Sequence, residues 1–328
     1  MNPEIILVGA SAGGVDALRV LTANLPRDLG AAVCVVLHTH ASSPQLLAQI
    51  LGNSGDLPVT YAEDEQPIEA GNVYLAPVDR HLLVEPGRMR VVTGPKENRH
   101  RPAIDPLFRS GALHYGARAI GVVLTGFLND GTSGLAAIKR CGGITVVQTP
   151  EDADVPEMPQ SALRHVAVDH CLPLAGIPPL LVQLVGTPVQ GAPNCAPEDL
   201  QAEVDIAAMR ANGMALNDHL GRRSTLTCPD YDGVLWEVDD DQVLRYRCHL
   251  GHAMTAEVLA SQQAESVERA LWLAIKTLEE SGALALRLAS RAREKGDEFS
   301  EGLFKARAEK AGSRAANLRE ILIKTATQ

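Results

Sequence analysis

Between residues 4 and 185, short apolar runs alternate with segments whose hydrophobic residues recur at helical spacing. The run from Ala31 to Leu37 is apolar throughout, which is typical of a strand buried on both faces of a sheet. Similar runs predict strands that begin at Glu4 and span 73–76, 119–125 and 144–148, with a hairpin over 81–92. This alternation predicts an α/β fold, in which a doubly wound, mostly parallel sheet carries an antiparallel hairpin.

The pattern changes in a proline- and glycine-rich stretch from Thr187 to Pro197, which has no apolar periodicity and indicates a linker. We therefore predict a first domain over 1–186, a linker over 187–200 and a C-terminal extension over 201–328. The extension is expected to hold a small β unit at about 224–254 and a helical hairpin at about 257–324. Gly296-Asp297 interrupts the second helical pattern and marks the predicted turn of that hairpin.

Composition narrows the class of protein. The formal net charge of −10 argues against nonspecific binding to nucleic acid. The sequence contains no long uncharged apolar run, so we expect no membrane span. No basic segment precedes the first strand, and the six cysteines are scattered rather than arranged as a disulfide framework. A cytoplasmic protein is the expectation.

The first predicted strand leads through Gly9-Ala10-Ser11-Ala12-Gly13-Gly14 into an amphipathic helix. Ser11 is therefore expected at a helix N-terminus, where unpaired N–H groups and the helix dipole favour an oxygen nucleophile and an oxyanion. The turn also fits G-x-S-x-G, a pattern that exposes a nucleophilic serine. A phosphate- or dinucleotide-binding loop and a simple serine N-cap are the alternatives.

Other polar residues follow the later strands. His38 and His40 come after the second strand, Asp79 after the 73–76 strand and Asp130 after the 119–125 strand. The carboxyl ends of parallel strands meet at one edge of a sheet, so these residues and Ser11 supply the parts of a nucleophile–base–carboxylate triad. Position alone leaves open which histidine and which aspartate take part, and each also has an ordinary role in a loop or turn.

Five motifs identify a family. They are GASAGG at 9–14, VVLH ending at His38, YLAP at 74–77, NRHRP at 98–102 and VVLTGFLNDGTSG at 122–134. With them, the region from about Ile5 to Leu184 resembles the catalytic domain of the chemotaxis protein-glutamate methylesterases, the CheB family. The resemblance implies Ser11 as nucleophile, His38 as base and Asp130 as orienting carboxylate, without a cofactor. It implies hydrolysis of glutamate γ-methyl esters on a methylated chemoreceptor, releasing methanol, with glutamine deamidation as a second activity.

Some positions depart from the family pattern. Ala12, Thr39, Phe127 and Leu128 stand where the family usually has threonine, methionine, methionine and glycine, which predicts an altered pocket wall around an unchanged triad. Backbone N–H groups near Gly13 and Gly14 are expected to hold the oxyanion. Arg99, Arg101 and Arg109 are expected either to dock an acidic receptor surface or to be ordinary surface residues.

The prediction has rivals. A catalytically idle module of the same fold that docks receptors is one alternative. Nucleotide binding is another, disfavoured because GASAGG lacks the third glycine of G-x-G-x-x-G and the lysine of a P-loop. Since the first strand begins at once, we expect no N-terminal receiver domain, and we expect the C-terminal half to act as the control element instead.

The small β unit carries Cys228-Pro229-Asp230-Tyr231 and Cys248-His249-Leu250-Gly251-His252. The pattern resembles a degraded zinc ribbon, with Tyr231 in place of the second cysteine. A tetrahedral structural site needs four ligands, and Cys228, Cys248 and His252 supply three, with Asp230 or His249 as substitutes for the fourth. The missing cysteine favours a metal-free β unit, so no metal ligands are predicted.

Overall fold

The computed structural model describes residues 2–189, 198–210, 213–239 and 243–325. The chain forms two compact units, Met1–Leu259 and Ala260–Gln328. Residues 190–197, which make up most of the predicted linker, lie outside the described residues.

The first unit is built on a seven-stranded parallel sheet in the order β3-β4-β2-β1-β7-β8-β9. Its strands are β1 (Ile5–Ala10), β2 (Ala32–Leu37), β3 (Val59–Tyr61), β4 (Val73–Leu75), β7 (Ala119–Val123), β8 (Ile144–Gln148) and β9 (His170–Leu172). Ala10 of β1 pairs with Leu37 of β2, so Ser11 and His38 leave the sheet at the same level. The predicted parallel sheet is confirmed.

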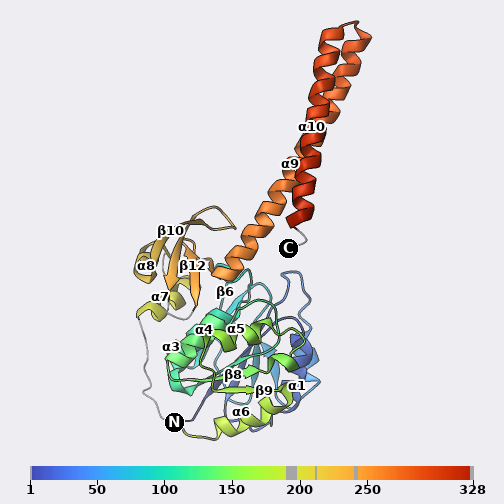
Figure 1. Ribbon diagram of the computed structural model, residues 1–328. Coiled ribbons are helices and arrows are strands. Elements are labelled where there is room, and N and C mark those ends of the chain that lie inside the picture. The colour runs from blue at the N-terminus through green and yellow to red at the C-terminus, as the bar shows by residue number, and fades with distance from the viewer. Residues whose placement is uncertain (1, 190–197, 211–212, 240–242, 326–328) are drawn as a thin grey trace. The chain divides into compact units, whose positions relative to one another are not determined.

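Helices cover both faces of this sheet (Figure 1). They are α1 (Gly14–Ala23), α2 (Leu47–Gly52), α3 (Ile104–Tyr115), α4 (Thr132–Arg140), α5 (Glu157–His165) and α6 (Ile177–Val185). Alternate residues of β1 enter different cores: Ile5 packs in the core that includes α3 and α4, and Ile6 in the core that includes α1 and α6. The continuous apolar strands follow from this double burial. The predicted hairpin, β5 (His81–Glu85) with β6 (Arg88–Val92), forms a two-stranded sheet of its own.

Residues 198–259 belong to the same compact unit as the parallel sheet. They form α7 (Glu198–Ala207), α8 (Gly213–Leu220) and a four-stranded antiparallel sheet of β10 (Arg222–Thr227), β11 (Val234–Asp239), β12 (Leu244–Cys248) and β13 (Ala253–Thr255). We call this segment the β unit. Its small core includes Cys228, Leu235 and Cys248, and Leu128 from the parallel-sheet region packs against it.

The second unit is a helical hairpin of α9 (Ala256–Glu294, whose first turn belongs to the first unit) and α10 (Glu298–Thr325). Gly296, with φ of 74°, lies in the turn, as the sequence predicts. Small residues bring the two helices together: a Cβ on Gly282 would lie 3.7 Å from Ala311 Cβ. Among the helices of the described residues, none is both long and apolar enough to cross a membrane.

Candidate active site

Ser11 occupies the turn between β1 and α1, where neighbouring strand ends fix its backbone. Its N–H donates to Thr125 O (2.9 Å), and the Thr125 hydroxyl donates to Ala12 O (2.9 Å). Gly126 leaves room for the serine side chain, since a Cβ at that position would lie 2.6 Å from Ser11 Cβ. The loop after β7 therefore sets both the backbone and the side-chain space of Ser11.

His38 lies next to this turn and is held by Asp130. Its Nε2 is 2.7 Å from Asp130 Oδ2, and the two side chains are 4% and 2% exposed. Nδ1 is buried without a hydrogen-bond partner. In the described part of the chain the Ser11 hydroxyl makes no hydrogen bond, but Ser11 and His38 line the same cleft. Hydrogen bonding of Nε2 to the carboxylate leaves Nδ1 as the ring nitrogen that can accept a proton.

The alternative residues, His40 and Asp79, line the same cleft but make other contacts. Asp79 accepts hydrogen bonds from Arg101 Nε (2.9 Å) instead of from a histidine. His40 is exposed, and its Nδ1 lies 2.8 Å from the Ser42 hydroxyl. The structure thus joins His38 to Asp130 and leaves the other two side chains out of that contact.

Asp130 is surrounded by donors. Besides His38, its carboxylate accepts hydrogen bonds from the N–H groups of Ile104 (2.6 Å) and Asp105 (3.3 Å) at the start of α3, and from Asn98 Nδ2 (2.9 Å). Burial acts to raise the pKa of Asp130, but the hydrogen bond to His38, the nearby imidazoles and the hydrogen bond from the Ile104 N–H keep it below the ordinary value. Asp130 is therefore ionised at neutral pH and able to stabilise an imidazolium.

Asp105 lies beside Asp130, but its pKa is shifted in the opposite direction. Burial, followed by the nearby Asp130 charge, raises the pKa of Asp105 to about 7. Its oxygens accept hydrogen bonds from Asn98 Nδ2 (3.0 Å) and Gly134 N (2.7 Å). A single amide group, Nδ2 of Asn98, therefore bridges the two carboxyl groups.

His100, from the NRHRP motif, completes the surroundings of His38, a role that no local sequence signal indicated. The two imidazole rings stack with centroids 3.6 Å apart and planes within 4°. Burial, and then the proximity of His38, lowers the pKa of His100 to about 4. A neutral ring at neutral pH thus covers one face of His38 without competing for its proton.

The β unit reaches the same network through Thr255. The Thr255 N–H donates to Asn98 Oδ1 (3.1 Å), and its hydroxyl exchanges hydrogen bonds with the Asn129 amide (2.8 and 3.1 Å). Asn98 donates a hydrogen bond to Asp130, and Asn129 precedes Asp130 in the chain. No short-range sequence signal indicated these contacts, because Thr255 is more than 120 residues from both asparagines.

The N–H groups near Gly13 and Gly14 differ in their availability to an oxyanion. The Gly14 N–H already donates to Ser11 O (2.8 Å). Within the described residues, the N–H groups of Ala12 and Gly13 have no hydrogen-bond acceptor. Both lie directly after Ser11 at the N-terminus of α1, which makes them the available donors for a developing oxyanion.

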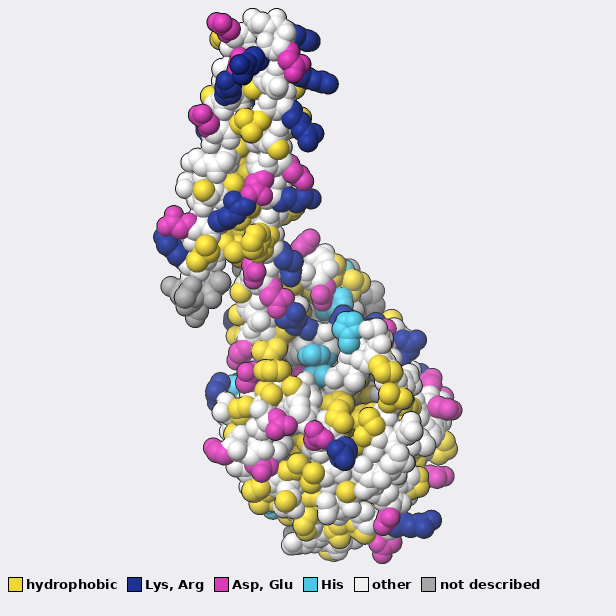
Figure 2. Space-filling model, turned by 90° about the vertical axis from the view of Figure 1, so that its right-hand side faces the viewer, with side chains coloured by type: hydrophobic (Ala, Val, Ile, Leu, Met, Phe, Trp, Pro, Cys, Tyr) yellow, Lys and Arg dark blue, Asp and Glu magenta, His cyan; other side chains and the backbone are white. Residues whose placement is uncertain are grey.

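The cleft in front of Ser11 and His38 has a volume of about 520 Å³. Lys96, Arg99 and Arg101 contribute to its wall, with Asp79 as the acidic member and Phe127 and Leu128 on the remaining side. Figure 2 shows histidine side chains gathered around a hollow on the surface of the first unit. Leu128 has a φ of 62°, a conformation that favours glycine, the residue usual at this position in the family that the motifs resemble.

Comparisons with known proteins decide the family. The CheB methylesterase family model matches residues 6–181. The chain belongs to the CheB methylesterase family. A Leptospira interrogans protein that carries both protein-glutamate methylesterase and protein-glutamine glutaminase in its name is 38% identical over 185 residues, 56% of this chain and 96% of that protein. The crystal structure of the Thermotoga maritima CheB methylesterase catalytic domain superposes with a TM-score of 0.54 at 33% identity, covering 56% of this chain and 100% of that one.

Other CheB relatives are longer than their match to this chain. A protein-glutamate methylesterase/protein-glutamine glutaminase of Hydrogenovibrio crunogenus is 39% identical over 186 residues, which is 49% of its length. Protein-glutamate methylesterase/protein-glutamine glutaminase 5 of Anaeromyxobacter dehalogenans is 40% identical over 185 residues, which is 51% of its length. The chain spans about half the length of these two, and the matches cover at most 56% of it.

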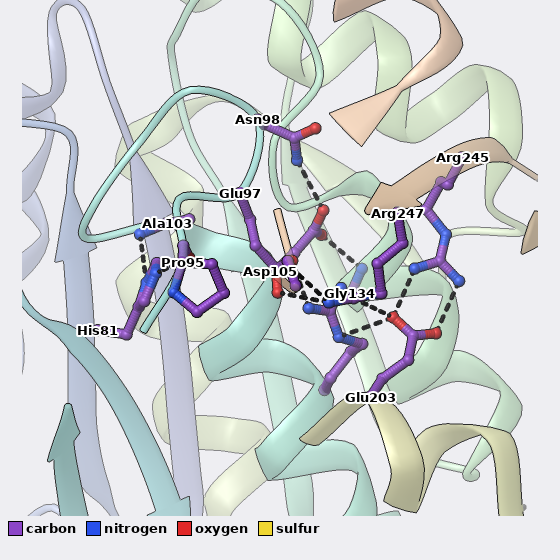
Figure 3. Close-up of polar contacts among 12 residues, drawn as sticks. His81, Pro95, Glu97, Asn98, Ala103, Asp105, Gly134, Glu203, Arg245 and Arg247 are labelled. Carbon is purple, nitrogen blue, oxygen red and sulfur yellow. Dashed lines mark hydrogen bonds and ion pairs between the residues drawn. The ribbon is translucent and has the colours of Figure 1, made fainter. Parts of the chain in front are cut away.

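A buried charge cluster joins the β unit to the parallel-sheet region (Figure 3). It consists of Glu97, Arg109, Glu203, Arg245 and Arg247. Glu203 of α7 accepts hydrogen bonds from both terminal nitrogens of Arg245 (2.6 and 2.8 Å), and its Oε2 is 3.3 Å from Arg109 Nε. Arg109, from α3, is 2% exposed, so the expectation that it lies on the surface is wrong.

Among the described residues, three side chains that could hold a metal ion lie together in the β unit. Ligand atoms of Cys228, Cys248 and His252 are within 4.8 Å of one another. Of the substitutes expected from sequence, His249 Nδ1 instead lies 2.9 Å from the Tyr231 hydroxyl. We call Cys228, Cys248 and His252 the thiol cluster.

Proposed function

We propose that this protein is a cytoplasmic hydrolase that removes γ-methyl esters from glutamate side chains of a chemoreceptor-like signalling protein, releasing methanol. Ser11 is the nucleophile, His38 the base and Asp130 the orienting carboxylate. The observation that carries the proposal is the buried His38–Asp130 contact beside Ser11, in a chain of the CheB family. Glutamine deamidation at the same site is the second activity, since the relatives named above carry both activities in their names.

The geometry supports a two-step mechanism. Ser11 Oγ attacks the ester carbonyl while His38 Nδ1 takes its proton, and Asp130 stabilises the imidazolium. The N–H groups of Ala12 and Gly13 hold the oxyanion, and the imidazolium returns its proton to the departing methoxide. Water then attacks the acyl-enzyme with His38 again as base, which frees glutamate and restores the Ser11 hydroxyl.

The cleft favours an acidic substrate. Lys96 and Arg99 contribute positive charge to its wall, and the Arg101 charge is offset by its ion pair with Asp79 (2.8 Å). Glutamate side chains next to the esterified residue would meet these cations when the substrate docks. The exposed residue Phe127, 54% accessible, provides an apolar contact for the ester methyl or for the substrate surface around it.

The test measures methanol released from a methylated chemoreceptor by the full chain and by Ser11→Ala. We expect the substitution to lower the rate by at least ~10³-fold, because the nucleophile is lost. Ser313→Ala, at an exposed serine of α10, is the matched control and should release methanol at the parent rate.

Two other results have distinct meanings. Methanol release that persists in Ser11→Ala would contradict the assignment of the nucleophile. Binding of the methylated receptor without release of methanol or ammonia by the parent chain would favour the idle docking module over the hydrolase.

A further inference from the structure

The thiol cluster lies where two turns of the antiparallel sheet meet. Cys228 follows β10, Cys248 ends β12 and His252 precedes β13. Both turns therefore lie at the same end of the four-stranded sheet, although they are separated by the β11 and β12 strands in the chain. Two turns that each present thiol or imidazole ligands toward a common point are the usual frame of a structural zinc site.

The distances within the cluster suit a zinc ion. His252 Nδ1 lies 3.5 Å from Cys248 Sγ and 3.9 Å from Cys228 Sγ. With ordinary Zn–S and Zn–N bond lengths, a tetrahedral ion separates a sulfur and a nitrogen ligand by about 3.6 Å. Both sulfur–nitrogen distances are thus close to those around a bound ion, and all three ligand atoms lie within 4.8 Å of one another.

The second turn is shaped to present these ligands. The His252 N–H donates to Cys248 Sγ (3.2 Å), a contact that favours a thiolate, and the Gly251 N–H donates to Cys248 O (2.9 Å). Gly251 has a φ of 99°, and a Cβ there would lie 2.7 Å from Pro95 Cγ and 2.8 Å from Ile206 Cγ2. Only glycine fits this turn, so its form is fixed by packing as well as by hydrogen bonds.

We propose that Cys228, Cys248 and His252 bind one zinc ion, with water as the fourth ligand. Two thiolates and an imidazole form a donor set that binds zinc in preference to magnesium or calcium, because those two ions require oxygen ligands. Both cysteines are fully buried, whereas His252 is half-buried, which leaves a solvent-accessible side for the water. The Tyr231 hydroxyl is directed at His249 Nδ1 and is not assigned as a ligand.

The role of the ion is structural. It would join the turn after β10 to the turn before β13, and β13 carries Ala253, whose carbonyl accepts a hydrogen bond from the Asn98 N–H (2.8 Å). Asn98 in turn donates to Asp130. The site therefore lies at the far end of a short chain of contacts that leads to the candidate active site, and its ligands do not touch the substrate cleft.

The first experiment measures metal content and needs no variant. The untagged full chain, purified without chelators, should contain about one zinc ion per molecule. Replacement of the zinc with Co²⁺ should give a thiolate-to-cobalt charge-transfer band in the near ultraviolet and the visible bands of a tetrahedral site. Absence of zinc after growth with added zinc, together with no such band on addition of Co²⁺, would overturn the proposal.

Variants then locate the site. Cys248→Ser should lose both the zinc and the cobalt charge-transfer band, whereas Cys171→Ser, at an exposed cysteine of β9, should retain both. If Cys248→Ser retains the band of the parent chain, the ion is bound elsewhere and the proposal is wrong.

Tyr231 provides a gain-of-function test that does not depend on a damaged fold. Tyr231→Cys supplies a third thiol as a fourth protein ligand, and we expect this variant to resist a chelator that strips zinc from the parent chain. Tyr231→Phe should hold zinc as tightly as the parent, because the hydroxyl is not a ligand. Zinc loss in Tyr231→Phe would contradict the assignment of water as the fourth ligand.

Discussion

In the candidate triad each side chain follows a strand of the parallel sheet, whereas in the thiol cluster the ligands lie at turns between antiparallel strands. Parallel pairing of β1 with β2 sets Ser11 and His38 at one edge by main-chain register, and hydrogen bonds from Asn98 and the start of α3 hold Asp130 beside them. The thiol cluster depends on the form of two turns, one of which is fixed by contact of Gly251 with Pro95 and Ile206. The comparison teaches that Ser11 and His38 are placed by the sheet itself, while Asp130 and the thiol cluster depend on contacts with neighbouring segments.

The largest effect is expected on kcat, from replacement of the Asp130 carboxylate as compared with the Asp79 carboxylate. Asp130→Asn removes the charge that stabilises the His38 imidazolium and reverses the hydrogen bond to Nε2, so kcat for methanol release should fall by about 10⁴-fold. Asp79→Asn, the matched variant at the alternative carboxylate, should change kcat little because Asp79 contacts Arg101 instead. Steady-state kinetics on both variants tests this, and equal losses would contradict the placement of Asp130 as the orienting residue.

The second effect is on the free energy of unfolding and arises in the buried charge cluster, which joins the β unit to the parallel-sheet region. Glu203→Gln leaves Arg245 and Arg247 buried without their carboxylate, and we expect a loss of about 3–5 kcal/mol in the free energy of unfolding. Glu237→Gln, which breaks the more exposed pair with Arg222, should cost less than about 1 kcal/mol. Denaturant unfolding of both variants measures the difference, and similar small losses would show that the buried charge cluster does not hold the regions together.

The buried charge cluster also predicts how the stability of the fold depends on pH. Burial acts to raise the pKa of Glu203, but Arg245 and Arg109 hold it well below the ordinary value. A lowered pKa in the folded state means that the carboxylate contributes stability above the unfolded pKa and that this contribution is lost as the pH falls through the folded pKa. Acid unfolding of the parent chain should therefore be steeper than that of Glu203→Gln.

The smallest effect is expected from the contact between the β unit and the candidate active site. Thr255→Val removes the hydroxyl that Asn129 contacts while it keeps the N–H that donates to Asn98. We expect kcat to fall by roughly tenfold or less, in line with about 1 kcal/mol for one buried hydrogen bond, with KM nearly unchanged. Thr255→Ser should restore kcat. An unchanged kcat in Thr255→Val would count against the C-terminal half as a control element acting through this contact.

Much of the parallel-sheet region could be predicted from sequence because its signals are local. Apolar runs such as Ala31–Leu37 mark buried strands, and residues directly after such runs, including Ser11 and His38, fall at one edge of the sheet. The choice of Asp130 over Asp79 needed the structure or the family motifs, since both follow strands.

The buried charge cluster could not be predicted, because its residues are distant in the chain and resemble ordinary surface charges in their local sequence. Arg109 and Glu203 are separated by 94 positions (203 − 109), and nothing in the local sequence distinguishes them from solvated side chains. Thr255 and Asn129 are likewise brought together only by tertiary packing. The predicted division into domains at 187–200 does not reveal that the β unit and the parallel-sheet region form one compact unit.

The most direct measurement of the central claim is covalent labelling of the full chain with a serine-reactive fluorophosphonate, followed by mass spectrometry of its peptides. The account predicts one phosphonyl group on the peptide that contains Ser11, no label after prior unfolding, and slower labelling in Asp130→Asn, because only an activated serine reacts. An unlabelled Ser11 under conditions that label other serine hydrolases, or a label confined to a different residue, would contradict the account.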